Sequence, residues 1–158
     1  MNKVKRIFSK IGLVVFLAVV HYVVISALLK NESSLTKISG IVSGQDSYHR
    51  GGRIPFYAII IAIDHSNMRF GVKDNKVAAF DYLSHHTVVG KRITILYDKD
   101  GDYELDDLTY NVYSVTVDGN EIMTISQGKL FYKWLLLWAI VADIATIFVF
   151  SKSRKSKR

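Results

Sequence analysis

The sequence predicts a membrane protein of mixed α and β structure, in which two transmembrane helices flank a small antiparallel β-sheet or barrel-like domain. The first observation is a pair of long apolar runs, at residues 11–29 and 130–150. The second is the charge distribution, since residues 31–129 hold ten Lys/Arg against thirteen acidic residues, whereas the flanking segments 1–30 and 130–158 hold eleven Lys/Arg and one acidic residue. The third is a series of short alternating segments between the two runs, which is typical of β-strands.

The first apolar run, residues 11–29, carries no formal charge. At about 1.5 Å per helical residue it nearly matches the roughly 30 Å hydrocarbon core of a bilayer. A cleaved signal peptide would have a shorter apolar run and a small-x-small cleavage site, which Ser26-Ala27-Leu28 matches poorly. The sequence therefore predicts an uncleaved first transmembrane helix.

The second apolar run, residues 130–150, predicts the second transmembrane helix. Tyr132, Trp134 and Trp138 near its start suit the interface between lipid and water, and Lys133 is placed to snorkel toward that interface. Ala139, Ala142 and Thr146 supply small side chains on one side, as close helix packing requires.

Two basic tails, at residues 1–10 and 151–158, set the expected orientation. Positive charge beside membrane helices favours the cytoplasmic side, so both termini are expected in the cytoplasm of a cell whose inner membrane the chain crosses twice. The domain at residues 31–129 is then extracytoplasmic. The C-terminal basic cluster also fits recruitment of anionic lipid, and the two interpretations are compatible.

Six segments of the central domain have the composition and alternation of strands. They are Leu35–Ser43, Phe56–Asp64, Arg69–Lys73, Arg92–Tyr97, Tyr110–Val117 and Glu121–Ile125. We expect the apolar segment Phe56–Asp64 to be central in the sheet. Alternation places Ile93 and Ile95 on one face of their strand, and Tyr113, Val115 and Val117 on one face of theirs.

One short helix and two turns complete the expected domain. Lys76–His86 has apolar residues near helical spacing, and Asp118-Gly119-Asn120 has the composition of a hairpin turn. Gly51-Gly52 lies between two arginines and could cradle a phosphate. Because the strand–loop–helix context and the Lys-Ser/Thr ending of such a loop are missing, we expect a hairpin loop instead.

Several classes of function find no support in this composition. The chain has no cysteine, which excludes disulfides, thiolate metal sites and cysteine nucleophiles. The excess positive charge lies at the two ends, so the domain lacks the basic character of a nucleic-acid interface. No HExxH, GxSxG or Walker motif occurs, and we expect no cofactor and no enzymatic activity.

An acidic stretch after the fourth expected strand is the most site-like feature of the domain. Asp98, Asp100, Asp102 and Glu104 alternate with other residues and could supply oxygen ligands to Ca²⁺. The position of Gly101 and the Thr at residue 109 break the EF-hand pattern, which favours a solvated turn. The same carboxylates could bind a basic partner. His85-His86 is the one histidine cluster, but no spacing in the sequence brings it a third zinc ligand.

A carboxylate lies inside the second apolar run. Asp143 is about 10 Å from the cytoplasmic end of its helix, and His21 is about 15 Å from the same end of the first helix. An ionisable residue inside a membrane is expected to have a partner, and these two side chains could pair. The pair could clamp the two helices or an oligomer together, bind another membrane protein, or serve a proton-linked role.

The chain resembles a family of bacterial membrane proteins of unknown function, in which a small β domain lies between two membrane helices. The residues that carry the resemblance are Gly40-Ile41-Val42, Phe56-Tyr57-Ala58-Ile59 and residues 89–98, whose sequence VGKRITILYD is similar to a Gly-basic-x-Val-x-Val-x-Tyr strand of that family. The family usually has prolines after the Tyr-Asp pair, so residues 99–128 depart from it. The resemblance implies the architecture and no site residues.

We therefore expect a non-enzymatic integral membrane protein whose extracytoplasmic domain binds a protein or an envelope component. The expected partners are the lipid bilayer and either another protein or further copies of the chain, and no nucleic acid. The alternative is a membrane-anchored immunity or inhibitor protein, whose net acidic domain would meet a basic toxin. A Ca²⁺- or metal-dependent enzyme is the third hypothesis, and it lacks the ligand spacing.

Overall fold

The computed structural model describes residues 3–53, 55–99 and 108–155, and it divides the chain into two compact units. The helical unit comprises residues 1–29 and 132–158, and the domain comprises residues 30–131. Asp100, Asp102 and Glu104 of the acidic stretch therefore lie outside the described residues.

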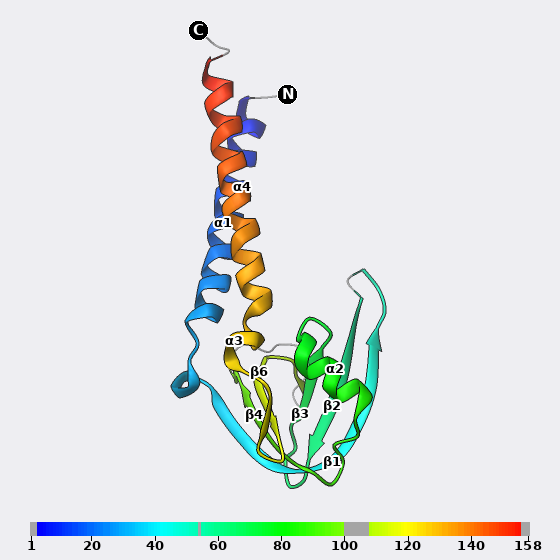
Figure 1. Cartoon of the computed structure of the whole chain (residues 1–158). Coiled ribbons are helices and arrows are strands. Elements are labelled where there is room, and N and C mark those ends of the chain that lie inside the picture. Colours follow the sequence, from blue (N-terminus) through cyan, green and yellow to red (C-terminus); the bar gives the residue numbers. More distant parts are fainter. Residues whose placement is uncertain (1–2, 54, 100–107, 156–158) are drawn as a thin grey trace. The chain divides into compact units, whose positions relative to one another are not determined.

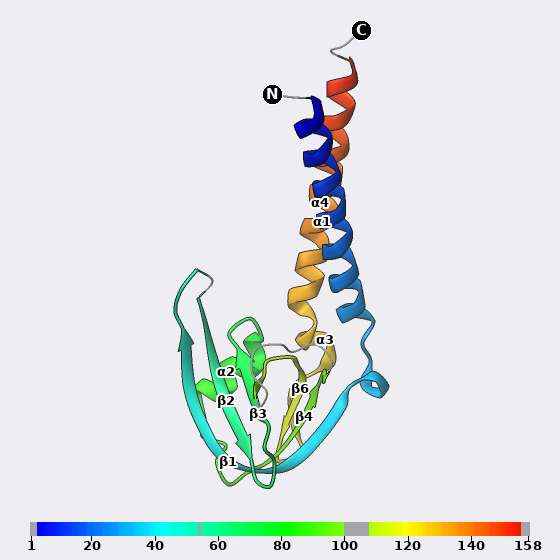
Figure 2. The same ribbon diagram turned by 180° about the vertical axis from the view of Figure 1, so that it is seen from behind.

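The helical unit consists of α1 (Lys3–Leu29) and α4 (Leu130–Lys155), which lie side by side (Figures 1 and 2). By length and composition, both are able to cross a membrane, α1 through Ile11–Leu29 and α4 through Leu130–Ile147. Most of their large apolar side chains are exposed, including Phe16, Trp134 and Trp138. Such surfaces are suited to lipid rather than to water.

Each of these helices has one stripe of less exposed residues, spaced by three or four positions. On α1 the stripe includes Val24 and Ala27, and on α4 it includes Ala139, all of them buried. Of the three small residues expected to permit close packing, Ala139 is buried, Thr146 is half-buried and Ala142 is exposed. The alanine that matters for packing is therefore Ala139.

The domain is built on a seven-stranded sheet with three short helices. The strands are β1 (Thr36–Arg50), β2 (Phe56–Ile63), β3 (Arg69–Lys73), β4 (Arg92–Tyr97), β5 (Leu108–Thr109), β6 (Val112–Val117) and β7 (Asn120–Met123). The helices are η1 (Glu32–Ser34), α2 (Val77–His85) and α3 (Ile125–Gly128). The strand order is β5-β3-β2-β1-β4-β6-β7, so β2 is interior as expected.

The prediction of a purely antiparallel sheet is wrong, because β3 and β5 pair in parallel through Arg69 with Leu108 and Phe70 with Thr109. The strand β5 has two residues, which is too short for any alternation to reveal it in the sequence. Among the described strands the order is open, with β5 and β7 at the two edges, rather than closed into a barrel.

The long strand β1 joins the two halves of the sheet. Residues 36–41 pair with β4 and residues 42–50 pair with β2, and a bulge separates Val42 from Gly44. Gly40 lies beside this point, where a Cβ would come within 2.5 Å of the Ile63 side chain. The bulge and the missing side chain let β1 curve, so that it begins and ends at the same end of the domain (Figures 1 and 2).

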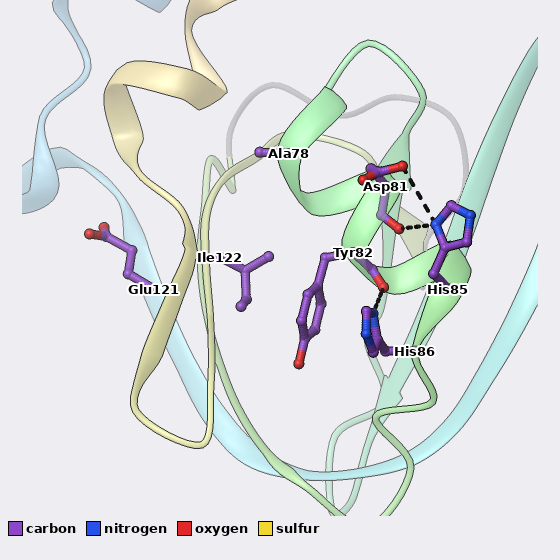
Figure 3. Close-up of a pocket in the computed structure, with 7 residues that line it drawn as sticks. All are labelled: Ala78, Asp81, Tyr82, His85, His86, Glu121 and Ile122. Carbon is purple, nitrogen blue, oxygen red and sulfur yellow. Dashed lines mark hydrogen bonds and ion pairs between the residues drawn. The ribbon is translucent and has the colours of Figure 1, made fainter.

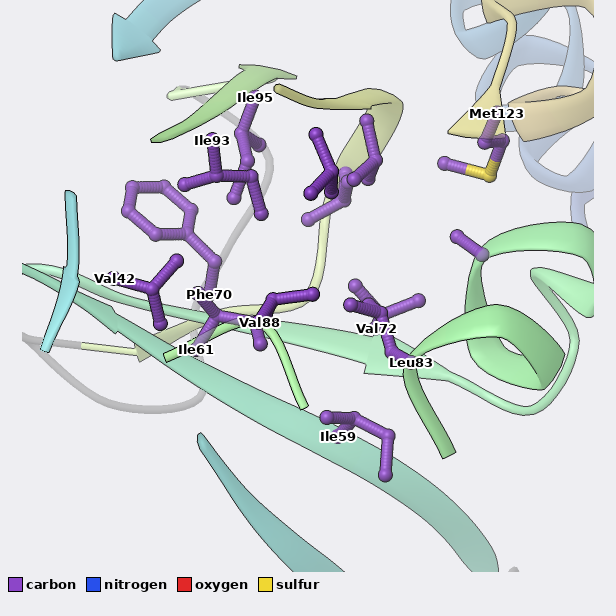
Figure 4. Close-up of a cluster of buried hydrophobic side chains, with 14 of the residues drawn as sticks. Val42, Ile59, Ile61, Phe70, Val72, Leu83, Val88, Ile93, Ile95 and Met123 are labelled. Carbon is purple, nitrogen blue, oxygen red and sulfur yellow. The ribbon is translucent and has the colours of Figure 1, made fainter. Parts of the chain in front are cut away.

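The main core lies inside the curved sheet, where α2 covers it. Figure 4 shows the apolar side chains that meet there, among them Ile61, Phe70, Leu83, Ile93 and Ile95. The expectation that Ile93 and Ile95 share a face is confirmed, since both are fully buried in this cluster.

The expected face of β6 is wrong at one position. Val115 and Val117 belong to the core, but Val112 joins them in place of Tyr113. A register shift in the β4–β6 ladder pairs Tyr97 with Val112 and Leu96 with Ser114, which leaves Tyr113 outside the alternation.

The turn between β6 and β7 follows the sequence expectation. Asp118 and Gly119 both have positive φ angles, 49° and 82°, as a two-residue hairpin of type I′ requires. The Asp118 carboxylate also accepts a hydrogen bond from the Arg92 N–H at 3.0 Å, which fixes the turn against β4. The expected loop at Gly51-Gly52 likewise joins two paired strands, β1 and β2.

Candidate functional site

A cleft of about 440 Å³ lies between α2 and β7 (Figure 3). Its walls are Ala78, Asp81, Tyr82, His85 and His86 on one side and Glu121 and Ile122 on the other. In Figure 3 the Ile122 side chain lies between β7 and the Tyr82 ring. Since β7 is an edge strand, the cleft runs beside a sheet edge.

The amphipathic pattern of α2 sets the orientation of the cleft residues. Ala79 and Leu83 are buried in the core, so the opposite side of the helix, which carries Asp81 and His85, is exposed. The expected helix at Lys76–His86 is confirmed within one residue at each end.

The end of α2 is held by a residue that sequence reasoning missed. The Gln45 side chain donates to the Leu83 carbonyl at 2.7 Å and to the His86 carbonyl at 3.0 Å, and its oxygen accepts from the Val88 N–H at 2.8 Å. A glutamine in a polar part of β1 gives no sequence signal for this role, because its partners lie some forty residues away on the backbone.

The two cleft histidines make the same local contact. The Nδ1 atom of His85 lies 2.8 Å from the Asp81 carbonyl oxygen, and that of His86 lies 2.9 Å from the Tyr82 carbonyl oxygen. When Nδ1 donates its hydrogen, a neutral imidazole presents Nε2 as an acceptor. The His86 ring also stacks on Tyr82 with centroids 4.5 Å apart. The cleft therefore offers acceptors and an aromatic surface.

Ser84, His85 and Asp81 lie close together, but they do not form a catalytic triad. The Ser84 hydroxyl is 3.2 Å from His85 Nδ1, and the Asp81 carboxylate is 3.5 Å from the same nitrogen. A triad needs the carboxylate on one ring nitrogen and the nucleophile on the other. Within the described chain, no group of three His, Asp or Glu side chains is arranged to hold a metal ion.

Asp98, the first residue of the acidic stretch, is an internal partner of the domain rather than part of a solvated turn. Its side chain is 12% exposed, and both carboxylate oxygens lie 3.1 Å from the Lys30 ammonium. Lys129 in turn donates to the Lys30 carbonyl. These contacts join residues near both ends of the domain.

A second residue missed by sequence reasoning is Lys76, which is 6% exposed. Its ammonium donates to the Gly128 carbonyl and lies 5.3 Å from the centre of the Tyr113 ring. Burial, helped by the charge of Lys73, lowers the pKa of Lys76 to about 8. Gly128 must be glycine here, since a Cβ would lie 2.2 Å from the Tyr113 carbonyl oxygen.

In the helical unit, the structure brings together the two polar residues named from the sequence. The Nε2 atom of His21 lies 3.2 Å from the Asp143 carboxylate, and its Nδ1 atom lies 2.8 Å from the Leu17 carbonyl oxygen. The Leu17 carbonyl can only accept, so Nδ1 carries the hydrogen in that contact, and the contact with Asp143 needs one further hydrogen, on Nε2 or on the carboxyl group. The pair therefore joins α1 to α4 by a polar contact.

Comparison of the chain with protein-family models, with curated proteins and with solved structures finds no match. The resemblance to a bacterial membrane family therefore stays a prediction.

Proposed function

We propose that this chain is a non-enzymatic integral membrane protein that presents its β domain outside the cytoplasm to bind a protein partner. The support for the membrane part is the pair of apolar helices, α1 and α4, at the two ends of the domain. Positive charge beside both helices supports cytoplasmic termini in an inner membrane crossed twice.

The observation that carries the binding proposal is the cleft beside the edge strand β7. An extended peptide can add to a sheet edge through main-chain hydrogen bonds while its side chains enter a neighbouring groove. Tyr82 and Ile122 give this groove an apolar floor, and the negatively charged Asp81 and Glu121 border it, with the Glu121 side chain pointing away from Tyr82 (Figure 3). A segment with apolar and basic residues is the partner chemistry that fits.

The immunity-type alternative rests on the net negative charge of the domain and on its acidic loop, in which Asp98 is paired with Lys30. The cleft offers an acidic surface for a basic partner at a different place, on α2 and β7.

The test is purification of the full chain in mild detergent, with Glu121→Lys as the variant. We expect a partner that copurifies with the parent chain to be lost, because a lysine at the sheet edge would repel a basic segment. Asp64→Lys is the matched control, since it makes the same charge change at an exposed position beyond the end of β2. If the partner is recovered equally with both variants, the binding site lies outside the cleft.

A further inference from the structure

The end of the β1–β2 hairpin carries exposed aromatic and basic side chains. We call Tyr48, His49, Arg50, Arg53 and Tyr57 the hairpin tip. All five are exposed, Tyr48 by 43% and Tyr57 by 55%. Exposed aromatic side chains beside arginines are typical of a surface that contacts the headgroup region of a bilayer.

The course of β1 brings the hairpin tip to one particular end of the domain. The strand leaves this end at Thr36, turns through the bulge between Val42 and Gly44, and returns along β2 to Arg50. The helix α3, just before the chain leaves the domain, lies at this same end (Figures 1 and 2). Lys129, which directly follows α3, donates to the carbonyl of Lys30, where the chain enters the domain. Lys30 directly follows α1, and Lys129 directly precedes α4.

On one face of the sheet, the hairpin tip packs against further aromatic side chains. Phe56 lies 6.2 Å from Tyr48 and 5.3 Å from Tyr110, measured between ring centroids. The Lys73 ammonium lies 4.5 Å from the Phe56 centroid and 4.3 Å from that of Tyr110. Gly71 makes room for this stack, because a Cβ there would lie 2.2 Å from the Tyr110 ring.

The other face of the hairpin tip has its own aromatic pair. The rings of His49 and Tyr57 stack with centroids 4.4 Å apart and planes 17° apart. The charged neighbour on this side is Asp74, whose carboxylate accepts from the Tyr57 N–H at 3.2 Å. The guanidinium of Arg50 lies 5.8 Å from the Phe56 ring. Arg50, Arg53 and Lys73 bring positive charge to this part of the described domain, and Asp46 and Asp74 bring negative charge.

We propose that the hairpin tip binds the anionic lipid headgroups of the membrane that α1 and α4 cross. The inference rests on the proposed function in one respect, that both helices span a bilayer. If they do, both ends of the domain lie at the bilayer surface by chain continuity, and the hairpin tip lies at that end too. Tyr48 and Tyr57 then occupy the interface, while Arg50 and Arg53 bind lipid phosphates.

The absence of cysteine allows a direct test on the full chain in lipid nanodiscs. A fluorophore on Gly51→Cys reports on the hairpin tip, and that position accepts a side chain because a Cβ there meets no atom within 4 Å. Discs of phosphatidylcholine, with or without phosphatidylglycerol, carry a nitroxide at the headgroup. We expect strong quenching at Gly51→Cys in the anionic discs and weaker quenching in the neutral ones.

The matched control is the same fluorophore on Asn67→Cys, in the exposed turn after β2. The eight residues of β2 separate this turn from the hairpin tip by about 26 Å, so it should stay unquenched. Each arginine near an anionic surface strengthens the contact about fivefold, and we expect Arg50→Gln with Arg53→Gln to abolish the difference between the two kinds of disc.

A fluorophore on Val15→Cys in α1, with a nitroxide deep in the acyl chains, separates the two proposals. If Val15→Cys is quenched but Gly51→Cys matches Asn67→Cys in anionic discs, the hairpin inference is overturned and the membrane proposal stands. If Val15→Cys is not quenched, both are overturned. Equal quenching of Gly51→Cys in neutral and anionic discs would overturn the role of the arginines.

Discussion

At the scale of single residues, Lys76 is a charged group held in surroundings unlike water. Its ammonium is buried against the Gly128 carbonyl and the Tyr113 ring, and its pKa is lowered to about 8. Burying an ammonium group is unfavourable, and this burial is the main cause of the lowered pKa of Lys76. Lys76 therefore makes the stability of the domain depend on pH.

The sign of this dependence follows from the direction of the pKa shift. The unfolded chain, with an ordinary lysine pKa of 10.5, binds a proton more readily than the folded chain does. The contribution of Lys76 to the free energy of unfolding is therefore lowest below about pH 8. It rises between about pH 8 and 10.5 and is constant above that range. The full difference is roughly 3 kcal/mol in the free energy of unfolding.

Lys76→Met should remove this rise. Urea unfolding of the parent chain and the variant, followed by circular dichroism at several pH values, gives the difference between their free energies of unfolding. The contributions of the other titrating groups are the same in both proteins and cancel in this difference. We expect the parent to gain stability relative to Lys76→Met between pH 8 and 10. A difference that does not change with pH would contradict a lowered pKa.

At the scale of elements, the site depends on how β1 meets α2. The part of β1 after the bulge pairs with β2, and from this part Gln45 reaches the end of α2 with three hydrogen bonds. This contact sets where His85 and His86 lie in the cleft.

Gln45→Leu should loosen residues 83–88 while the sheet remains. A leucine has nearly the same size but makes none of the three hydrogen bonds, each worth about 1 kcal/mol net. Hydrogen–deuterium exchange should therefore quicken in this segment. Ser47→Leu is the control, because Ser47 is exposed two residues further along the same strand. Unchanged exchange in Gln45→Leu would show that other contacts hold the end of α2.

The sequence predicts the helices and strands better than it predicts the residues that shape the site. The apolar runs, the hairpin at Asp118-Gly119 and the strand at residues 92–97 are local patterns, and each was recognisable from its own residues. The second half of β1 is polar, so its pairing with β2 could not be foreseen. Gln45 and Lys76 make contacts with residues far along the chain, and no local pattern reports such contacts.

At the scale of the whole molecule, orientation is the first property to measure. Because the chain has no cysteine, single cysteines report topology without background. On intact cells, Ser47→Cys should react with a membrane-impermeant thiol reagent and Ser156→Cys should react only after the cells are opened. The reverse labelling would place the domain in the cytoplasm.

The contacts among Lys30, Asp98 and Lys129 bear on the order in which the domain folds during synthesis. The first half of β1 must wait for β4, more than fifty residues later, whereas the second half can pair with β2 almost at once. Lys129 reaches the Lys30 carbonyl across a separation of 99 residues. Such distant contacts form slowly and late. The contact between Lys129 and Lys30 forms only after Lys129, the residue directly before α4, has left the ribosome. The domain is therefore completed at the time when α4 becomes available to the membrane.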